Sequence, residues 1–105
     1  ITSAAAFTLG SGSQFREVYR NTSVSVGTGG TTVFDTGGSG SYLVIMYQTG
    51  DDRGCTAFVS WNGASSTYIT YIQRTTDGVQ MSTNNLQLVS AVGTYNFSAV
   101  VYKIH

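Results

Sequence analysis

The sequence predicts an all-β protein, folded as an antiparallel sandwich or barrel. The first observation is that Tyr, Phe, Val and Ile recur in compact runs, and these residue types favour strands. The second is that Gly, Ser and Thr make up 41 of the 105 residues and gather between those runs. Short strands at such spacing are typical of sandwiches and barrels. No run has a convincing helical pattern, and a chain of this length fits one domain.

Nine runs are predicted as strands, and turn-forming segments separate them. Gly, Asn, Asp and Ser end each run because they tolerate positive φ or bond to their own backbone. The separating segments are GTGG, TGGSGS, TGDDRG, NGASS, TDG, TNN and AVG. In chain order the predicted strands are Phe15–Asn21, Ser23–Val26, Thr31–Asp35, Ser41–Thr49, Cys55–Trp61, Thr67–Arg74, Val79–Ser82, Leu86–Val89 and Tyr95–Ile104.

The predicted strands differ in how many of their faces are apolar. In Cys55–Trp61 the apolar residues fall mostly on one face, which suits a strand between core and solvent. The run from Tyr42 to Tyr47 is apolar or aromatic at six consecutive positions, so both of its faces need cover. An apolar outer sheet face on a free monomer favours aggregation. We therefore predict that further copies of the chain cover it in a homo-oligomer.

The charge balance excludes several classes of partner. Five acidic and five basic residues leave no net charge, so no electrostatic field attracts nucleic acid. No apolar stretch reaches the roughly 18–20 residues of a membrane span, and the N-terminal ITSAAAFTLG lacks the pattern of a signal peptide. We predict no nucleic-acid partner, no membrane insertion and no cofactor. Because the chain opens without Met, we interpret it as a module of a longer protein.

The segment TGDDRGC concentrates Asp51, Asp52 and Arg53 between two apolar runs. Glycines bracket these charges, which is the composition of a solvated hairpin turn. Two functional interpretations compete with that turn. The carboxylates could act as general acid and base, or could hold Ca²⁺ together with Asp35 or Asp77. Adjacent residues of an extended chain point to opposite sides, so the turn is the favoured interpretation.

No catalytic residue is predicted. Ser-His-Asp chemistry needs a histidine inside the fold, whereas the single histidine, His105, is the last residue. Three copies of His105 could meet and bind a metal in a trimer, but a frayed terminus is the favoured interpretation. Cys55 lacks a base and suits a small buried residue. A zinc site within one chain would need more Cys and His ligands than the sequence contains.

Trp61 is the candidate for a binding platform. In the segment SWNGASSTY the single tryptophan lies where a strand enters a polar loop, next to Asn62. An aromatic ring flanked by amides and hydroxyls is suited to stacking against a sugar ring. Trp61 also falls on the apolar face of its strand, so a position in the core or at a subunit interface stays open as the alternative. Tyr68, Arg74 and Asp77 lie near neighbouring turns and could join such a site.

Three stretches carry a family resemblance: TTVFDTGGSGSYLVIMYQTG, CTAFVSWNGASSTYITYIQ and DGVQMSTNNLQLVSAVGTYNFSAVVYKIH. They contain a Gly-rich hairpin before a wholly apolar strand, a short Asn-Leu-Gln-Leu strand and a final strand with alternating aromatic residues. From about Thr31 to His105 the chain resembles the C-terminal head domains of bacteriophage tail fibres and tailspikes. The resemblance implies a jelly-roll-like β-sandwich, assembled as a homotrimer at the tip of a fibre in the virion and extracellular during host attachment.

The function implied by the resemblance is a receptor-binding tip that recognises a glycan or protein receptor on the host cell surface. The alternative is a domain that caps the trimer and registers the fibre without binding anything. If the tip binds, we expect loops to carry the binding, because strand side chains are committed to the core and to subunit contacts. The predicted ligand-binding residues are Trp61, Asn62, Tyr68, Asp51, Asp52, Arg53, Arg74 and Asp77.

Overall fold

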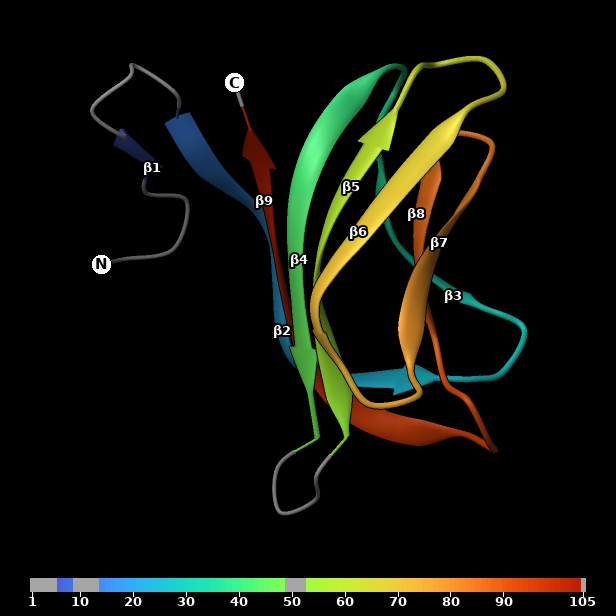
Figure 1. Ribbon diagram of the computed structural model, residues 1–105. Coiled ribbons are helices and arrows are strands. Elements are labelled where there is room, and N and C mark those ends of the chain that lie inside the picture. Colours follow the sequence, from blue (N-terminus) through green and yellow to red (C-terminus); the bar gives the residue numbers. More distant parts are fainter. Residues whose placement is uncertain (1–5, 9–13, 49–52, 105) are drawn as a thin grey trace.

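The computed structural model describes residues 6–8, 14–48 and 53–104, with side chains described from residue 14 onward. Within these ranges the chain forms strands joined by turns and loops, without a helix (Figure 1). The all-β prediction is therefore confirmed. The strands in the described ranges are β1 (Ala6–Thr8), β2 (Gln14–Val26), β3 (Thr31–Asp35), β4 (Gly40–Tyr47), β5 (Gly54–Trp61), β6 (Thr67–Arg74), β7 (Gly78–Ser82), β8 (Asn85–Val89) and β9 (Tyr95–Ile104).

The strands pair into two antiparallel sheets. The larger sheet has the order β1-β2-β9-β4-β5-β6, and the smaller has the order β3-β8-β7. The smaller sheet lies against one side of the larger one, with β7 in contact with β5 and β6, and β3 in contact with β2 (Figure 1). Successive hairpins join β4, β5 and β6. Their register places Tyr47 opposite Gly54, and Cys55 opposite Arg74.

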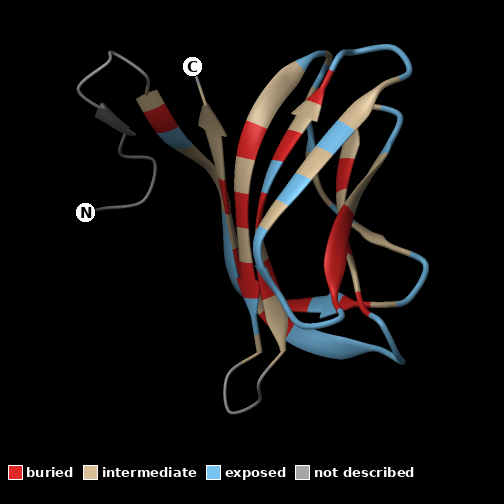
Figure 2. Ribbon diagram, viewed as in Figure 1, coloured by how far each residue is buried: buried red, intermediate tan, exposed pale blue. Residues whose placement is uncertain are grey.

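One hydrophobic core joins the two sheets, and its buried residues appear as bands along the strands in Figure 2. Strands β2, β4, β5 and β9 supply it from the larger sheet, and β7 and β8 supply it from the smaller sheet. This arrangement is compatible with a β-sandwich. The buried cluster consists of Val24, Val26, Tyr42, Val44, Met46, Cys55, Ala57, Val59, Val79, Leu86, Leu88, Phe97, Ala99 and Val101.

The predicted strands agree closely with the observed ones, with differences at several ends. Strands β4, β5, β7 and β8 begin one residue earlier than predicted, and Gln48, predicted in a strand, follows the end of β4. Strands β3, β6 and β9 have the predicted bounds. The segments Phe15–Asn21 and Ser23–Val26, predicted as separate strands, both belong to β2, whose pairing with β9 is irregular between Asn21 and Val24. Strand β1 is not predicted by the sequence. Thr49, predicted at the end of a strand, lies outside the described residues.

The outward side of the larger sheet carries apolar and aromatic side chains on β9, β4, β5 and β6, interspersed with uncharged polar residues such as Ser60, Thr70 and Ser98. Its side chains alternate with the buried ones, and none of the described outward positions on these strands holds a charged residue. Strand β4 is thus apolar on both sides, as predicted, whereas the cover of this side by another copy stays a prediction. This surface, termed the outer face, comprises Leu43, Ile45, Phe58, Tyr68, Ile72, Val100 and Tyr102.

Candidate functional site

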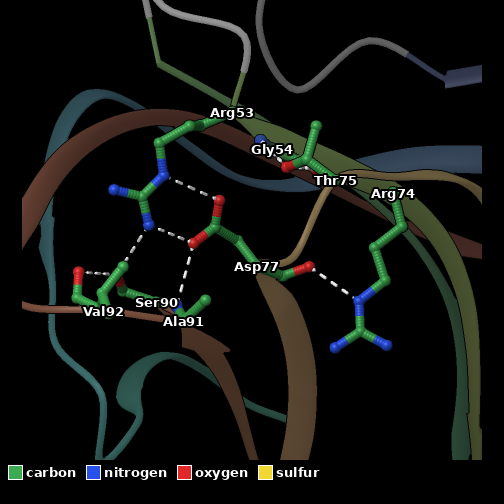
Figure 3. Close-up of polar contacts among 8 residues, drawn as sticks. All are labelled: Arg53, Gly54, Arg74, Thr75, Asp77, Ser90, Ala91 and Val92. Carbon is green, nitrogen blue, oxygen red and sulfur yellow. Dashed lines mark hydrogen bonds and ion pairs between the residues drawn. The ribbon is translucent and has the colours of Figure 1, made fainter.

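Two of the predicted site residues, Arg53 and Asp77, form an ion pair with each other. Arg53 precedes β5, and Asp77 lies in the turn between β6 and β7. The Nη2 atom of Arg53 lies 2.6 Å from Oδ1 of Asp77, and its Nε atom donates to Oδ2 at 3.2 Å (Figure 3). The guanidinium also lies 4.1 Å from the centroid of the Tyr95 ring. Two hydrogen bonds in parallel match the planar guanidinium to the carboxylate.

Asp77 is fully buried, and its carboxylate has further partners in the turn after β8. The backbone NH of Ala91 donates to its Oδ1 at 2.9 Å. Ser90 Oγ accepts from Arg53 Nη2 at 3.1 Å and donates to the Val92 carbonyl at 3.0 Å. Burial acts to raise the pKa of Asp77, but the hydrogen bonds from Arg53 and Ala91 and the charge of Arg53 outweigh it and lower the pKa.

Arg74 belongs to the same cluster through its side chain. Its Nε atom donates to the backbone carbonyl of Asp77 at 3.0 Å, and its guanidinium lies 4.3 Å from the centroid of the Tyr71 ring. The structure therefore brings Arg53, Arg74 and Asp77 together, as Figure 3 shows. Both arginines donate to Asp77, and each guanidinium also lies over an aromatic ring of a strand. The cluster fastens the start of β5 to the turns at one end of the smaller sheet.

Trp61 is buried, with 7% of its surface exposed. Its indole Nε1 donates to Oδ1 of Asn84 at 2.9 Å, which ties the end of β5 to the turn between β7 and β8. Buried indole NH groups usually have such a partner. Of the two interpretations left open by the sequence, this placement favours the core position, because the ring has little surface left for a sugar.

The remaining predicted residues are dispersed. Asn62 holds its own loop together, since its Oδ1 accepts from the backbone NH groups of Ala64, Ser65 and Ser66 at 2.8–3.0 Å. The side chain of Tyr68 is 71% exposed and lies on the outer face. Asp51, Asp52 and His105 lie outside the described residues.

A hollow of about 210 Å³ lies where β4, β5 and β6 end beside one another. This hollow was not predicted from the sequence, although Tyr47 and Gln48 directly precede the charged segment TGDDRGC. Burial raises the pKa of the Cys55 thiol in its wall to about 11, so this thiol is protonated at neutral pH. The hollow, termed the hairpin pocket, is lined by Ile45, Met46, Tyr47, Gln48, Arg53, Gly54, Cys55, Thr56, Gln73 and Thr75.

A smaller hollow of about 60 Å³ lies on the other side of Tyr47, against β2 and β9. Within the described part of the chain, no group of three His, Cys, Asp or Glu side chains is placed to hold a metal ion. The same residues include no helix long and apolar enough to cross a membrane.

Comparison of the chain with protein-family models, with curated proteins and with solved structures gave no match.

Proposed function

We propose that this chain is the receptor-binding tip module of a bacteriophage tail fibre or tailspike. In this proposal the two sheets form a jelly-roll-like sandwich, three copies assemble as a homotrimer, and the tip attaches the virion to a glycan or protein receptor on the host surface. The proposal is supported by the resemblance from about Thr31 to His105 and by an all-β fold compatible with a β-sandwich.

The hairpin pocket is the observation that carries the proposed binding role. It combines one exposed aromatic ring, Tyr47, with the amides of Gln48 and Gln73 and the hydroxyls of Thr56 and Thr75. Ligand sites typically combine apolar surface with a few placed polar groups in this way. Arg53, one of the residues that the sequence predicts for the ligand-binding surface, lines the pocket.

The proposed role is binding without catalysis. Asp77 is paired with Arg53, so its carboxylate is not available as an acid or base. The raised pKa of Cys55 keeps its thiol in the weakly nucleophilic protonated form. These two side chains are therefore proposed to serve the fold.

A trimer cap that binds no receptor is the second candidate, and the outer face favours it. Interface cores are depleted of charged residues and enriched in aromatic ones. The outer face has both properties, with Phe58 and Tyr68 exposed in a single chain. Contact between copies through this face suits either candidate, so assembly alone does not separate them.

Binding by the isolated domain separates the two candidates. The fluorescently labelled domain is applied to an array of bacterial surface polysaccharides and to whole bacteria. The receptor-binding role predicts attachment that an excess of unlabelled domain competes away. Absence of attachment to every target, together with loss of fibre assembly when the domain is deleted, would support the cap and overturn the receptor-binding role.

A further inference from the structure

Strands β2 and β9 bring two positive charges together at one end of the larger sheet. Arg16 of β2 pairs directly with Lys103 of β9 in their antiparallel register. Residues paired in this way have their side chains on the same side of the sheet, with Cβ atoms about 5 Å apart. Two long basic side chains therefore start from neighbouring positions. The side chains of Arg16 and Lys103 are termed the cationic pair.

The cationic pair lies at the margin of the side of the sheet that faces the core. Lys103 is also paired with Tyr42 of β4, whose side chain belongs to the core cluster. In Figure 1, the start of β2 and the end of β9 lie apart from β7 and β8. Arg16 is exposed and Lys103 is partly buried. Solvent therefore reaches the pair.

The described acidic side chains are engaged away from the cationic pair. Glu17 directly follows the arginine of the pair in β2, so it points to the other side of the sheet. There its Oε1 lies 2.7 Å from Nη2 of Arg20. Asp35 bonds within its own turn, and Asp77 has its own ion pair. Residues 1–13 contain no acid. Neither member of the cationic pair forms an ion pair with a described residue.

The two remaining acids are Asp51 and Asp52, in the segment between β4 and β5. This segment follows Tyr47, whereas Lys103 pairs with Tyr42, nearer the start of β4. The stretch of strand from Tyr42 to Tyr47 spans roughly 17 Å. Charges this far apart in water are largely screened, because the Debye length at physiological ionic strength is about 8 Å. The two positive charges are therefore left without a nearby acidic side chain.

Two uncompensated like charges opposite each other favour the binding of an anion. Like charges at directly paired positions of a sheet are unfavourable, and an anion between them removes the repulsion. The guanidinium of Arg16 offers a planar fork of donors, and the ammonium of Lys103 offers a compact charge with donors of its own. Carboxylate and phosphate groups accept from both kinds of donor. A neutral sugar hydroxyl would leave the two charges unbalanced.

From the register, the exposure of Arg16 and the lack of a neighbouring acidic side chain, we propose that the cationic pair binds one anionic group of an acidic surface glycan, a carboxylate or a phosphate. Both side chains donate to the same anion, Arg16 through its fork and Lys103 through its ammonium. The assignment rests on the proposed receptor-binding function. It adds a ligand contact near the start of β4, whereas the hairpin pocket lies near the end of that strand.

Titration of the ¹⁵N-labelled domain with single sugars tests the assignment. The probes are glucuronic acid, which carries a carboxylate, and glucose 6-phosphate, with glucose as the neutral counterpart of both. We expect at least one acidic sugar to shift the amide signals of Arg16 and Lys103, with a dissociation constant on the order of 1 mM. Glucose should leave these signals unchanged, and added salt should weaken the binding of the acidic sugar. Inorganic phosphate, a free anion, is expected to bind more weakly than glucose 6-phosphate.

Variants of the pair identify the contacts. Arg16→Gln and Lys103→Gln each remove one charge and are expected to weaken the binding of the acidic sugar about tenfold, through the loss of a charge-assisted hydrogen bond. Arg20→Gln is the matched control, because it removes the same charge from the same strand, where Arg20 is paired with Glu17. Its affinity for the acidic sugar should equal that of the parent. Circular dichroism shows whether each variant is folded, so that a loss of binding reports the contact itself.

The possible outcomes separate this assignment from the proposed function. The assignment is overturned if no acidic sugar at about 50 mM, far above the expected constant of about 1 mM, shifts the signals of the pair. It is also overturned if glucose binds as tightly as the acidic sugars, or if Arg16→Gln and Lys103→Gln bind as the parent does. Acidic sugars that bind no more tightly than inorganic phosphate would mark an adventitious ion only and overturn it as well.

Cell attachment provides the second comparison. A variant that combines Arg16→Gln with Lys103→Gln should attach to cells more weakly than the parent. Attachment equal to that of the parent would sink the site and leave the receptor-binding role. Binding of an acidic sugar at the pair, without attachment of the parent to any cell or array, would support the site and sink that role.

Discussion

Asp77 carries a buried negative charge. Arg53 neutralises this charge in an ion pair, and the backbone NH of Ala91 donates a hydrogen bond to the same carboxylate. Removing one partner of a buried ion pair lowers the stability of the fold, because the other charge is then left buried without an opposite charge beside it. The ion pair also links the start of β5 to the turns after β6 and β8. We therefore assign both side chains a structural role at this end of the sandwich.

Asp77→Asn tests that role, since it keeps the size of the side chain and removes its charge. We expect the free energy of unfolding to fall by about 3 kcal/mol, as for other broken buried pairs. Urea titration followed by tryptophan fluorescence measures the change. The control is Asp35→Asn, because Asp35 is exposed and its carboxylate accepts from the NH of Gly37, two residues along the chain, at 2.9 Å. A loss as small as that of the control would contradict the structural role.

The pH dependence of this effect has a defined sign. The pKa of Asp77 is lower in the folded chain than its ordinary value. Its contribution to stability is therefore fully present above the ordinary Asp pKa of about 3.9 and is lost as pH falls towards the folded value. The difference in stability between the parent and Asp77→Asn should be constant near neutral pH and should narrow below about pH 4.

Tyr42 presents the opposite case, because removal of its buried hydroxyl should not lower the stability of the fold. Its side chain is fully buried, its ring centroid lies 5.6 Å from that of Phe34, and its hydroxyl has no hydrogen-bond partner among the described residues. Tyr42→Phe removes the hydroxyl and keeps the packing. We expect an equal or higher melting temperature, because an unsatisfied buried group is lost. A loss of stability above about 1 kcal/mol would show that the hydroxyl has a partner.

Both residues of the ion pair were predicted as site residues, but their contact with each other was not predicted. Arg53 and Asp77 were both named for ligand binding, on the basis of charge and nearby turns. They are 24 residues apart, and the register of β5 with β6 and the path of the next turn bring them together. The same limit applies to the hairpin pocket, because three strand ends build it and no short motif specifies them.

At the scale of the strands, the predicted bounds agree best with the observed ones where turn-forming residues mark the start of a strand. Strands β3, β6 and β9 were predicted with their observed bounds, and a turn-forming residue lies just before the start of each: Gly30, Ser66 and Gly93. Strand β2 was divided at Thr22 because polar residues interrupt its apolar pattern, whereas the chain stays extended through an irregularity in register there. Strand β1 is only three residues long, too short to show an alternation.

Gly54 begins β5 in a conformation that other residues rarely adopt, with φ of +144°. A Cβ atom there would collide with the backbone carbonyl oxygen of Met46 on the paired strand. We expect Gly54→Ala to lower the free energy of unfolding by more than about 1 kcal/mol. Gly29→Ala is the matched control, because a Cβ there meets nothing within 4 Å. Thermal unfolding followed by circular dichroism measures both, and equal melting temperatures would contradict the clash.

At the scale of the whole molecule, the larger sheet packs against the core with one of its two sides. The inner face of the larger sheet is covered by the smaller sheet, and the outer face has no cover within the described chain. A chain of this size buries only roughly 60–70% of its unfolded surface, so contact with other copies adds useful burial. The hairpin pocket, where β4 ends and β5 begins, lies at the margin of this face.

The outer face is therefore the expected contact between copies in the proposed homotrimer. Light scattering coupled to size-exclusion chromatography should give three times the 11.1 kDa of one chain. Phe58→Arg places a charge within the uncharged face and should yield monomers, because a desolvated charge without a partner is unfavourable. Val92→Arg, which adds the same charge at an exposed position outside the outer face, should remain trimeric. A monomeric mass for the parent at micromolar concentration would contradict the trimer, and a trimeric Phe58→Arg would show that another surface joins the copies.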